Sequence, residues 1–159
     1  MLNRELIAFV QEPVMIILTV QGLDGRPTIG RGLGARAGAD GARLDLFFSR
    51  AQWPDLAAGC TADAPIAATF CRPSTYRTYQ VKGRVLETVP VDADDHRLAH
   101  AYMRDTRAVL KGLGISDRQV DYWLTDRDLA RVGFAPDAVF TQTPGPDAGR
   151  ILADARQCS

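Results

Sequence analysis

The residues best suited to chemistry lie on one face of a single predicted strand, residues 75–89 (TYRTYQVKGRVLETV). Polar and apolar side chains alternate along this segment, which is the period of a half-buried β-strand. The polar face carries a hydroxyl, an amide and two cations: Thr78, Gln80, Lys82 and Arg84. This face suits an anionic ligand or a partner subunit, although an exposed antiparallel strand with ordinary polar residues has the same pattern.

Other reactive residues form no complete catalytic or metal site in the sequence. No serine lies in a G-x-S-x-G elbow, and no cysteine has an obvious histidine partner. His96 and His100 share a helix face, but no third metal ligand is apparent, so we expect solvent-facing histidines and no metal. Residues 30–35 match the loose dinucleotide pattern G-x-G-x-x-A, yet a turn and a strand follow where a helix is required. These glycines instead predict a strand that bends or closely approaches a ligand.

Composition excludes several classes of function. The chain has 159 residues, enough for one domain with a hydrophobic core, and 19 basic residues balance 19 acidic ones. Zero net charge argues against broad binding to nucleic acid or to a membrane surface. Cys60, Cys71 and Cys158 lack the spacing of a disulfide framework or a zinc site. The longest apolar run, residues 14–20, is too short to span a bilayer and no secretory signal is visible, so we expect a cytoplasmic protein.

The predicted elements place the polar strand face in a mostly antiparallel barrel with helices outside it. Turn glycines between apolar runs predict a β-meander over residues 14–49, and a hairpin with a longer second arm follows it. No repeat or linker interrupts the chain, so we expect a single domain over residues 1–159, mainly β (α+β), with a tail from about residue 143 that is extended or loosely docked. The predicted helices are 2–11, 52–60, 92–111 and 116–124, and the predicted strands are 14–20, 27–37, 43–49, 64–71, 75–89, 129–134 and 138–142.

Three short motifs, in order, resemble the pyridoxamine 5'-phosphate oxidase-like, FMN-binding split-barrel family. Residues 31–36 (RGLGAR) resemble the family's second strand, which has two basic residues separated by four mostly apolar ones. Residues 48–52 (FSRAQ) resemble the end of its third strand, where an aromatic and a hydroxyl residue precede the phosphate-binding helix. Residues 77–83 (RTYQVKG) resemble its fifth strand in the arginine, the valine and the glycine. The resemblance covers roughly residues 5–90.

This resemblance implies an antiparallel split β-barrel of Greek-key type that binds flavin mononucleotide (FMN) between the two subunits of a homodimer. It implies flavin-dependent oxidoreduction of a small molecule, in which no protein nucleophile is needed. Positions 31 and 36 differ by an odd number, so either a bulge at Gly32 or Gly34 realigns the two arginines, or only one of them touches the ligand. The implied cofactor contacts are Arg31, Gly32, Leu33, Arg36, Phe48, Ser49, Arg50, Gln52, Thr78 and Gln80.

Two departures from the family pattern keep an alternative open. Gln52 stands near the place of a common family lysine, and Thr78 stands where the family glutamine aligns. The alternative is a protein without turnover that holds flavin, deazaflavin or haem as a sensor or carrier. A haem site would need an axial ligand, and His96 and His100 are the histidines of the chain.

Overall fold

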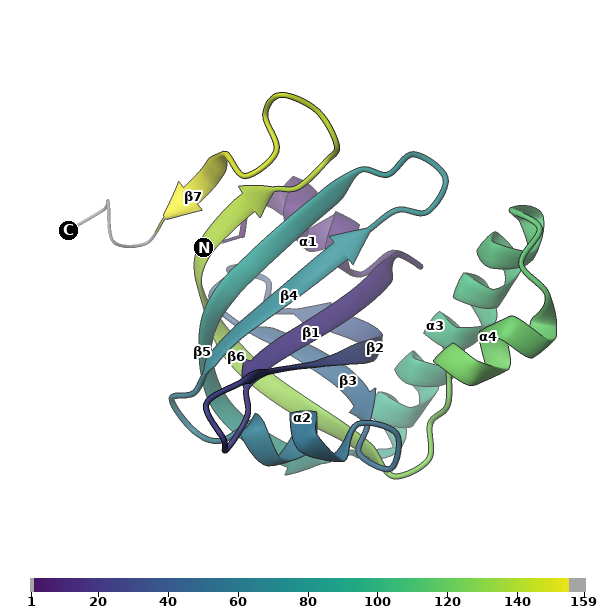
Figure 1. Ribbon diagram of the computed structural model, residues 1–159, viewed down its shortest axis with the longest axis horizontal. Helices are drawn as coiled ribbons and strands as arrows, with labels where there is room; N and C mark the ends of the chain where they lie inside the picture. The colour runs from purple at the N-terminus through teal and green to yellow at the C-terminus, as the bar shows by residue number, and fades with distance from the viewer. Residues whose placement is uncertain (1, 155–159) are drawn as a thin grey trace.

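Six antiparallel strands close into a barrel, which confirms the predicted split-barrel α+β fold. The computed structural model describes residues 2–154. The strands are β1 (Met15–Gln21), β2 (Pro27–Ala37), β3 (Leu44–Ser49), β4 (Pro65–Cys71), β5 (Thr78–Pro90), β6 (Leu129–Thr141) and β7 (Ile151–Asp154). Their order in the sheet is β3-β2-β1-β4-β5-β6-β7, and a further pairing of β3 with β6 closes the ring (Figure 1). The predicted β1–β2–β3 meander and the β4–β5 hairpin are both present.

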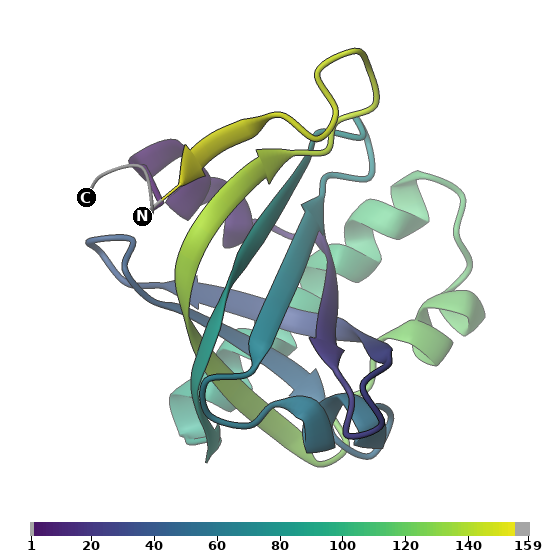
Figure 2. The ribbon, with the colours of Figure 1, turned by 60° about the vertical axis from the view of Figure 1, so that its left-hand side comes forward.

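Four helices surround the barrel: α1 (Arg4–Val10), α2 (Pro54–Gly59), α3 (Ala93–Gly112) and α4 (Asp117–Trp123). Helices α1 and α2 lie at opposite ends of the barrel, whereas α3 and α4 lie together at one side (Figures 1 and 2). Capping boxes begin both α3 and α4, with Asp92 and Ser116 as the respective N-cap residues. No helix within residues 2–154 is long and apolar enough to cross a bilayer.

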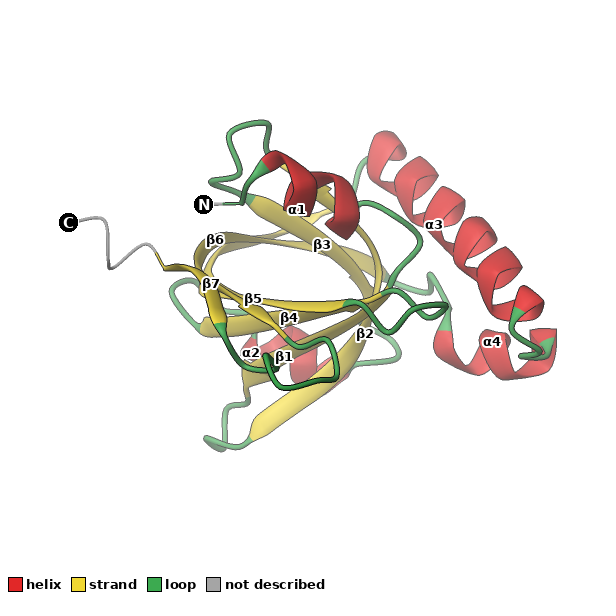
Figure 3. Cartoon of the chain, turned by 90° about the horizontal axis from the view of Figure 1, so that it is seen from above, coloured by secondary structure: helices red, strands yellow, loops and turns green. Residues whose placement is uncertain are grey.

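Side-chain alternation separates the barrel interior from its outer face. Along β1, Ile16, Leu18 and Val20 are buried while the residues between them are partly exposed. Phe48, Phe70 and Phe134 fill the interior with fully buried rings. Burial of each such ring stabilises the fold by roughly 1.5–3 kcal/mol relative to exposure. Seen end-on, the strands form a ring, with α3 and α4 outside it (Figure 3).

A bulge in β2 decides which way its arginines point. Gly32 pairs with Phe48 and Ala35 with Leu46, so β2 holds one more residue than β3 between these pairs. Gly34 lies in this bulge with a φ of 125°, and a Cβ there would lie 2.8 Å from the side chain of Leu98 on α3. The extra residue places Arg31 and Arg36 on the same outer face. The bulge predicted as one of two alternatives is therefore present.

The two late strands predicted at 129–134 and 138–142 are wrong as separate elements, because β6 runs through both. Pro136 has no N–H to donate, but it lies opposite Gly83 where the β5–β6 register shifts. The shift accommodates the proline without ending the strand. Residues 151–154, in the segment expected to be extended or loosely docked, pair with β6 as β7.

Replacing Gly83 with alanine should destabilise the barrel. A Cβ at this position would lie 2.0 Å from the carbonyl oxygen of Ala135, so β5 and β6 would have to separate locally. We expect Gly83→Ala to lower the free energy of unfolding by roughly 2–4 kcal/mol in urea denaturation. Gly112→Ala is the matched control, because nothing lies within 4 Å of a Cβ there. Equal stability of the two variants would contradict this account of the β5–β6 contact.

Candidate functional site

Arg31 is a partly buried cation without an anionic partner. It projects from the outer face of β2, opposite Ile17 of β1, and its guanidinium carbon lies 4.8 Å from the ring centre of Trp123 on α4. Burial lowers the pKa of Arg31 below its usual value, since charge is less favourable away from water. Within residues 2–154 its side chain makes no hydrogen bond or ion pair. Its N–H edge is therefore available to an anion.

Arg36, the second arginine of the β2 motif, is already occupied by carboxylates. Its guanidinium lies 3.0 Å from Asp95, whose side chain is fully buried, and 3.5 Å from Asp45. Asp95 also accepts a hydrogen bond from Arg131 at 2.7 Å and forms the capping box of α3 with Asp92. Arg36 thus joins β2 to α3, and two acidic groups already neutralise its charge.

Ser49, Arg50 and Gln52 gather near Arg31, but their side chains contact one segment of the chain itself. This segment comprises residues 122–128, the last two residues of α4 and the loop that leads to β6, and is termed the α4–β6 connection. Gln52 Nε2 donates to the carbonyl oxygen of Tyr122 at 2.7 Å, and Arg50 pairs with Asp128 at 2.7 Å. The fully buried Ser49 Oγ donates to the carbonyl oxygen of Arg127 and accepts from the N–H of Gln52.

Three further predicted contacts face the interior. The side chains of Leu33 and Phe48 are 1% and 0% exposed. A Cβ at Gly32 would lie 2.6 Å from Ile16 inside the barrel, so this residue also faces inward. Only backbone groups of these residues could reach a ligand on the outer face.

Thr78 and Gln80 lie on the same outer face as Arg31 but far from it. Cross-strand pairs connect Arg31, Ile17, Thr69, Gln80 and Phe140 in one row across β2, β1, β4, β5 and β6. Three strand spacings separate Arg31 from Gln80, about 14 Å. Gln80 Nε2 donates to Thr69 Oγ1 at 3.2 Å, and the buried Thr78 donates to the carbonyl oxygen of Tyr76. The predicted residues therefore form one cluster near Arg31 and a second, separate group on β5.

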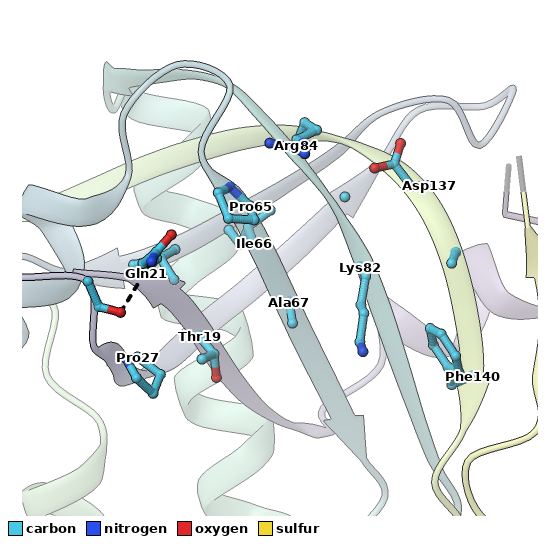
Figure 4. A pocket seen from close by; sticks show the side chains of 14 residues that line it. Thr19, Gln21, Pro27, Pro65, Ile66, Ala67, Lys82, Arg84, Asp137 and Phe140 are labelled. Atoms are coloured by element: carbon cyan, nitrogen blue, oxygen red, sulfur yellow. Dashed lines mark hydrogen bonds between the residues drawn. The ribbon is translucent and has the colours of Figure 1, made fainter. Parts of the chain in front are cut away.

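A groove of about 630 Å³ runs along the outer face beside this second group. Thr19, Ala67, Lys82, Arg84, Asp137 and Phe140 are among its lining residues (Figure 4). The Lys82 ammonium lies 4.7 Å from the ring centre of Phe140, and Arg84 donates to the carbonyl oxygen of Asp63. Lys82 makes no ion pair within the described part of the chain. The outer face thus presents a cation at each side, with Thr19, Thr69 and apolar residues among those between them.

Sequence reasoning missed Trp123 and Phe140 as parts of this surface. Trp123 ends an amphipathic helix and Phe140 lies in a β-strand, so both match the pattern of ordinary core or interface residues. Each lies under a cation of the outer face. No local sequence signal links them to Arg31 and Lys82, because the contacts depend on how α4 and β6 pack.

Both histidines are exposed on α3, as predicted. Their ring centres lie 6.1 Å apart, and His100 Nε2 lies 2.7 Å from Asp126, whose pKa this contact lowers below its usual range. No cluster of three or more His, Cys, Asp or Glu among residues 2–154 is arranged to hold a metal ion. Cys60 and Cys71 are free, and Cys158 lies outside the described residues.

Comparison with known proteins identifies the fold. No protein-family model and no curated sequence matches the chain. Among solved structures, HupZ from Group A Streptococcus superposes with a TM-score of 0.54 at 14% identity, covering 94% of this chain and 100% of that chain. HutZ, the haem storage protein from Vibrio cholerae, gives 0.51 at 14%, covering 88% and 94%. A proposed pyridoxamine 5'-phosphate oxidase from Lactobacillus delbrueckii gives 0.50 at 14%, covering 87% and 93%. The resemblance to the split-barrel family is therefore confirmed at the level of the fold.

The surroundings of Arg36 predict a structural role that can be measured. Arg36→Ala leaves the buried Asp95 with Arg131 as its remaining ion-pair partner, so we expect a loss of roughly 1–3 kcal/mol in the free energy of unfolding. Arg50→Ala removes an exposed pair and should cost less than about 1 kcal/mol. Urea denaturation at neutral pH compares the two. An Arg36→Ala variant as stable as wild type would show that the Asp95 network does not depend on this arginine.

Proposed function

We propose that the protein binds FMN between two copies of the chain and catalyses flavin-dependent oxidoreduction of a small molecule. The outer face from Arg31 to the groove beside Lys82 is the proposed surface for cofactor and partner subunit. Bound FMN would supply the hydride chemistry, and the protein would supply binding and orientation. Free Cys60 and Cys71 agree with a location in the reducing cytoplasm.

The observation that carries the proposal is the unpaired charge of Arg31. A partly buried cation without a counter-ion is costly, and an anionic ligand offsets that cost. A phosphate monoester suits the guanidinium edge, which presents several donors in one plane. Arg31 also stands in the motif by which the sequence resembles the FMN-binding family.

The other predicted contacts support a narrower role than the sequence implied. Arg36 and Arg50 already have carboxylate partners, and Ser49 and Gln52 already donate to carbonyl oxygens. We propose that Arg31 makes the principal charge-assisted contact with the phosphate. Arg36, Arg50, Ser49 and Gln52 would surround it, and Gly32, Leu33 and Phe48 would contribute backbone at most. Thr78 and Gln80 would lie toward the partner subunit.

A second copy of the chain is the proposed cover for the open sheet face. Ile29 is 60% exposed on this face, next to Thr19 and beyond it Ala67, which are partly exposed. In a twofold interface the same patch meets itself, so each outward residue would act twice. FMN held between the subunits would link cofactor binding to dimerisation by mass action.

The second candidate is a protein that holds flavin, deazaflavin or haem without turnover. The departures at Gln52 and Thr78 favour it, and HutZ shows that a haem storage protein has this fold. His100 lies against Asp126, the arrangement by which a carboxylate commonly orients a metal-binding histidine. His96 and His100 are therefore the residues to test for haem.

Loss of the Arg31 side chain should weaken FMN more than riboflavin. The two ligands differ in the phosphate, so we expect Arg31→Ala to cost roughly 1.5–3 kcal/mol of FMN affinity, about 10- to 150-fold, and to change riboflavin affinity little. Quenching of flavin fluorescence gives both dissociation constants. Arg104→Ala, an exposed arginine of α3 that pairs with Asp105, is the control and should leave both unchanged.

An equal loss for the two flavins would remove Arg31 from the phosphate site. Failure to bind either flavin at micromolar concentration, together with haem uptake that His96→Gln and His100→Gln abolish, would establish the haem alternative instead.

The sheet face also predicts a dimer that one substitution should disrupt. Ile29→Glu places a charge on the proposed interface in both copies, so we expect a shift toward monomer at tens of micromolar in analytical ultracentrifugation, and a weaker shift with FMN present. Leu113→Glu, in the α3–α4 connection and 48% exposed, should leave the association state unchanged. A wild type that is monomeric while binding one FMN tightly would disprove a site between subunits.

A further inference from the structure

The α4–β6 connection binds the polar neighbours of Arg31 but makes no hydrogen bond or ion pair with Arg31 itself. Its carbonyl oxygens at Tyr122 and Arg127 accept from Gln52 and Ser49, and Asp128 pairs with Arg50. The ring centre of Trp123 lies 4.8 Å from the guanidinium carbon of Arg31. The guanidinium lies over the indole ring, and its N–H groups make no hydrogen bond within residues 2–154.

Helix α4 holds Trp123 in a fixed place. Val120 and Leu124, on either side of it in the chain, are 0% and 4% exposed and belong to the hydrophobic core. Arg107 of α3 binds Asp117 at 3.2 Å and Asp121 at 2.6 Å, which ties α4 to α3. The Ser116 capping box fixes the start of the helix. The indole is therefore presented to Arg31 by an anchored element.

Such support matters for Arg31, whose side chain is long and flexible. An arginine has many rotamers, and the loss of this freedom on binding opposes affinity. Hydrogen bonds commonly hold an arginine in one rotamer, but this side chain makes none within residues 2–154. The contact with Trp123 limits the rotamers open to the guanidinium before a ligand arrives.

We propose that Trp123 is a positioning residue, which holds the guanidinium of Arg31 so that its N–H edge faces the anionic group of the ligand. The inference rests on the proposed function, in that the anionic group is the phosphate of FMN. It adds a residue outside the three motifs of the sequence, and it assigns the preference for a phosphorylated flavin to a pair of residues from β2 and α4.

The test compares FMN with riboflavin in Trp123→Leu and Trp123→Phe. Trp123→Leu removes the aromatic face, and the ratio of riboflavin to FMN dissociation constants should fall about three- to thirtyfold. Trp123→Phe keeps a ring and should retain most of the ratio. In the Arg31→Ala background, Trp123→Leu should have no further effect on the ratio, because the two residues act on the phosphate as one unit.

A fluorescence titration avoids the risk that Trp123→Leu fails to fold. The chain has two tryptophans, so Trp53→Phe leaves Trp123 as the one indole while keeping an aromatic ring at position 53. Titration of this flavin-free variant with inorganic phosphate should give a saturable change in tryptophan emission. Addition of Arg31→Ala should abolish the change, and sodium chloride at equal ionic strength should not reproduce it.

The outcomes separate this inference from the proposed function. If Arg31→Ala leaves the FMN preference intact, the phosphate site itself is wrong. If Arg31→Ala removes the preference but Trp123→Leu does not, or if Trp123→Leu is equally damaging without Arg31, Trp123 does not position the arginine. Tryptophan emission of the folded Trp53→Phe protein that does not change on addition of phosphate would also overturn the positioning role.

Discussion

The candidate site depends on the ion pairs of the buried Asp95 carboxylate with Arg36 and Arg131. Asp95 closes the capping box of α3 and lies between Arg36 of β2 and Arg131 of β6. A buried carboxylate needs its charge to be paired. Arg131 donates a hydrogen bond to Asp95 Oδ2, and the Arg36 guanidinium lies 3.0 Å from Oδ1. By fixing α3 against the barrel, Asp95 also fixes α4, and α4 carries the tryptophan that meets Arg31.

The bulge in β2 is the second constraint, and it acts together with the first. The additional residue near Gly34 turns Arg31 and Arg36 to the same outer face, yet their environments differ. Arg36 faces the acidic residues under α3, whereas Arg31 faces an indole and solvent. Two arginines of one motif therefore have different surroundings: Arg36 pairs with a carboxylate of α3, and Arg31 has no ion pair within the described residues.

The fold by itself does not determine which ligand is bound. Structures with the same barrel include a haem storage protein and a proposed pyridoxamine 5'-phosphate oxidase, so the barrel alone selects no ligand. Among the residues discussed, the outer-face cations without an ion pair in the described part of the chain are Arg31 on β2 and Lys82 and Arg84 on β5. Arg31 and Lys82 each lie over an aromatic ring, Trp123 and Phe140 respectively, which favours one position of the charge.

Local sequence patterns predict the faces of the strands and the order of the elements. Alternation along residues 78–85 and the turn glycines between apolar runs are local signals, and local periodicity is enough to predict the antiparallel barrel. The sequence did not reveal that β6 continues through Pro136, because the register shift beside it, with Asp137 as the additional residue of β6, exists only in the pairing with β5. Nor did it show which arginines are paired. Arg50 and Asp128 form an ion pair although 78 residues separate them, and Arg31 contacts Trp123 because α4 packs beside β2. The tertiary structure alone decided which charge stays free, because pairing depends on distances between elements that sequence spacing does not encode.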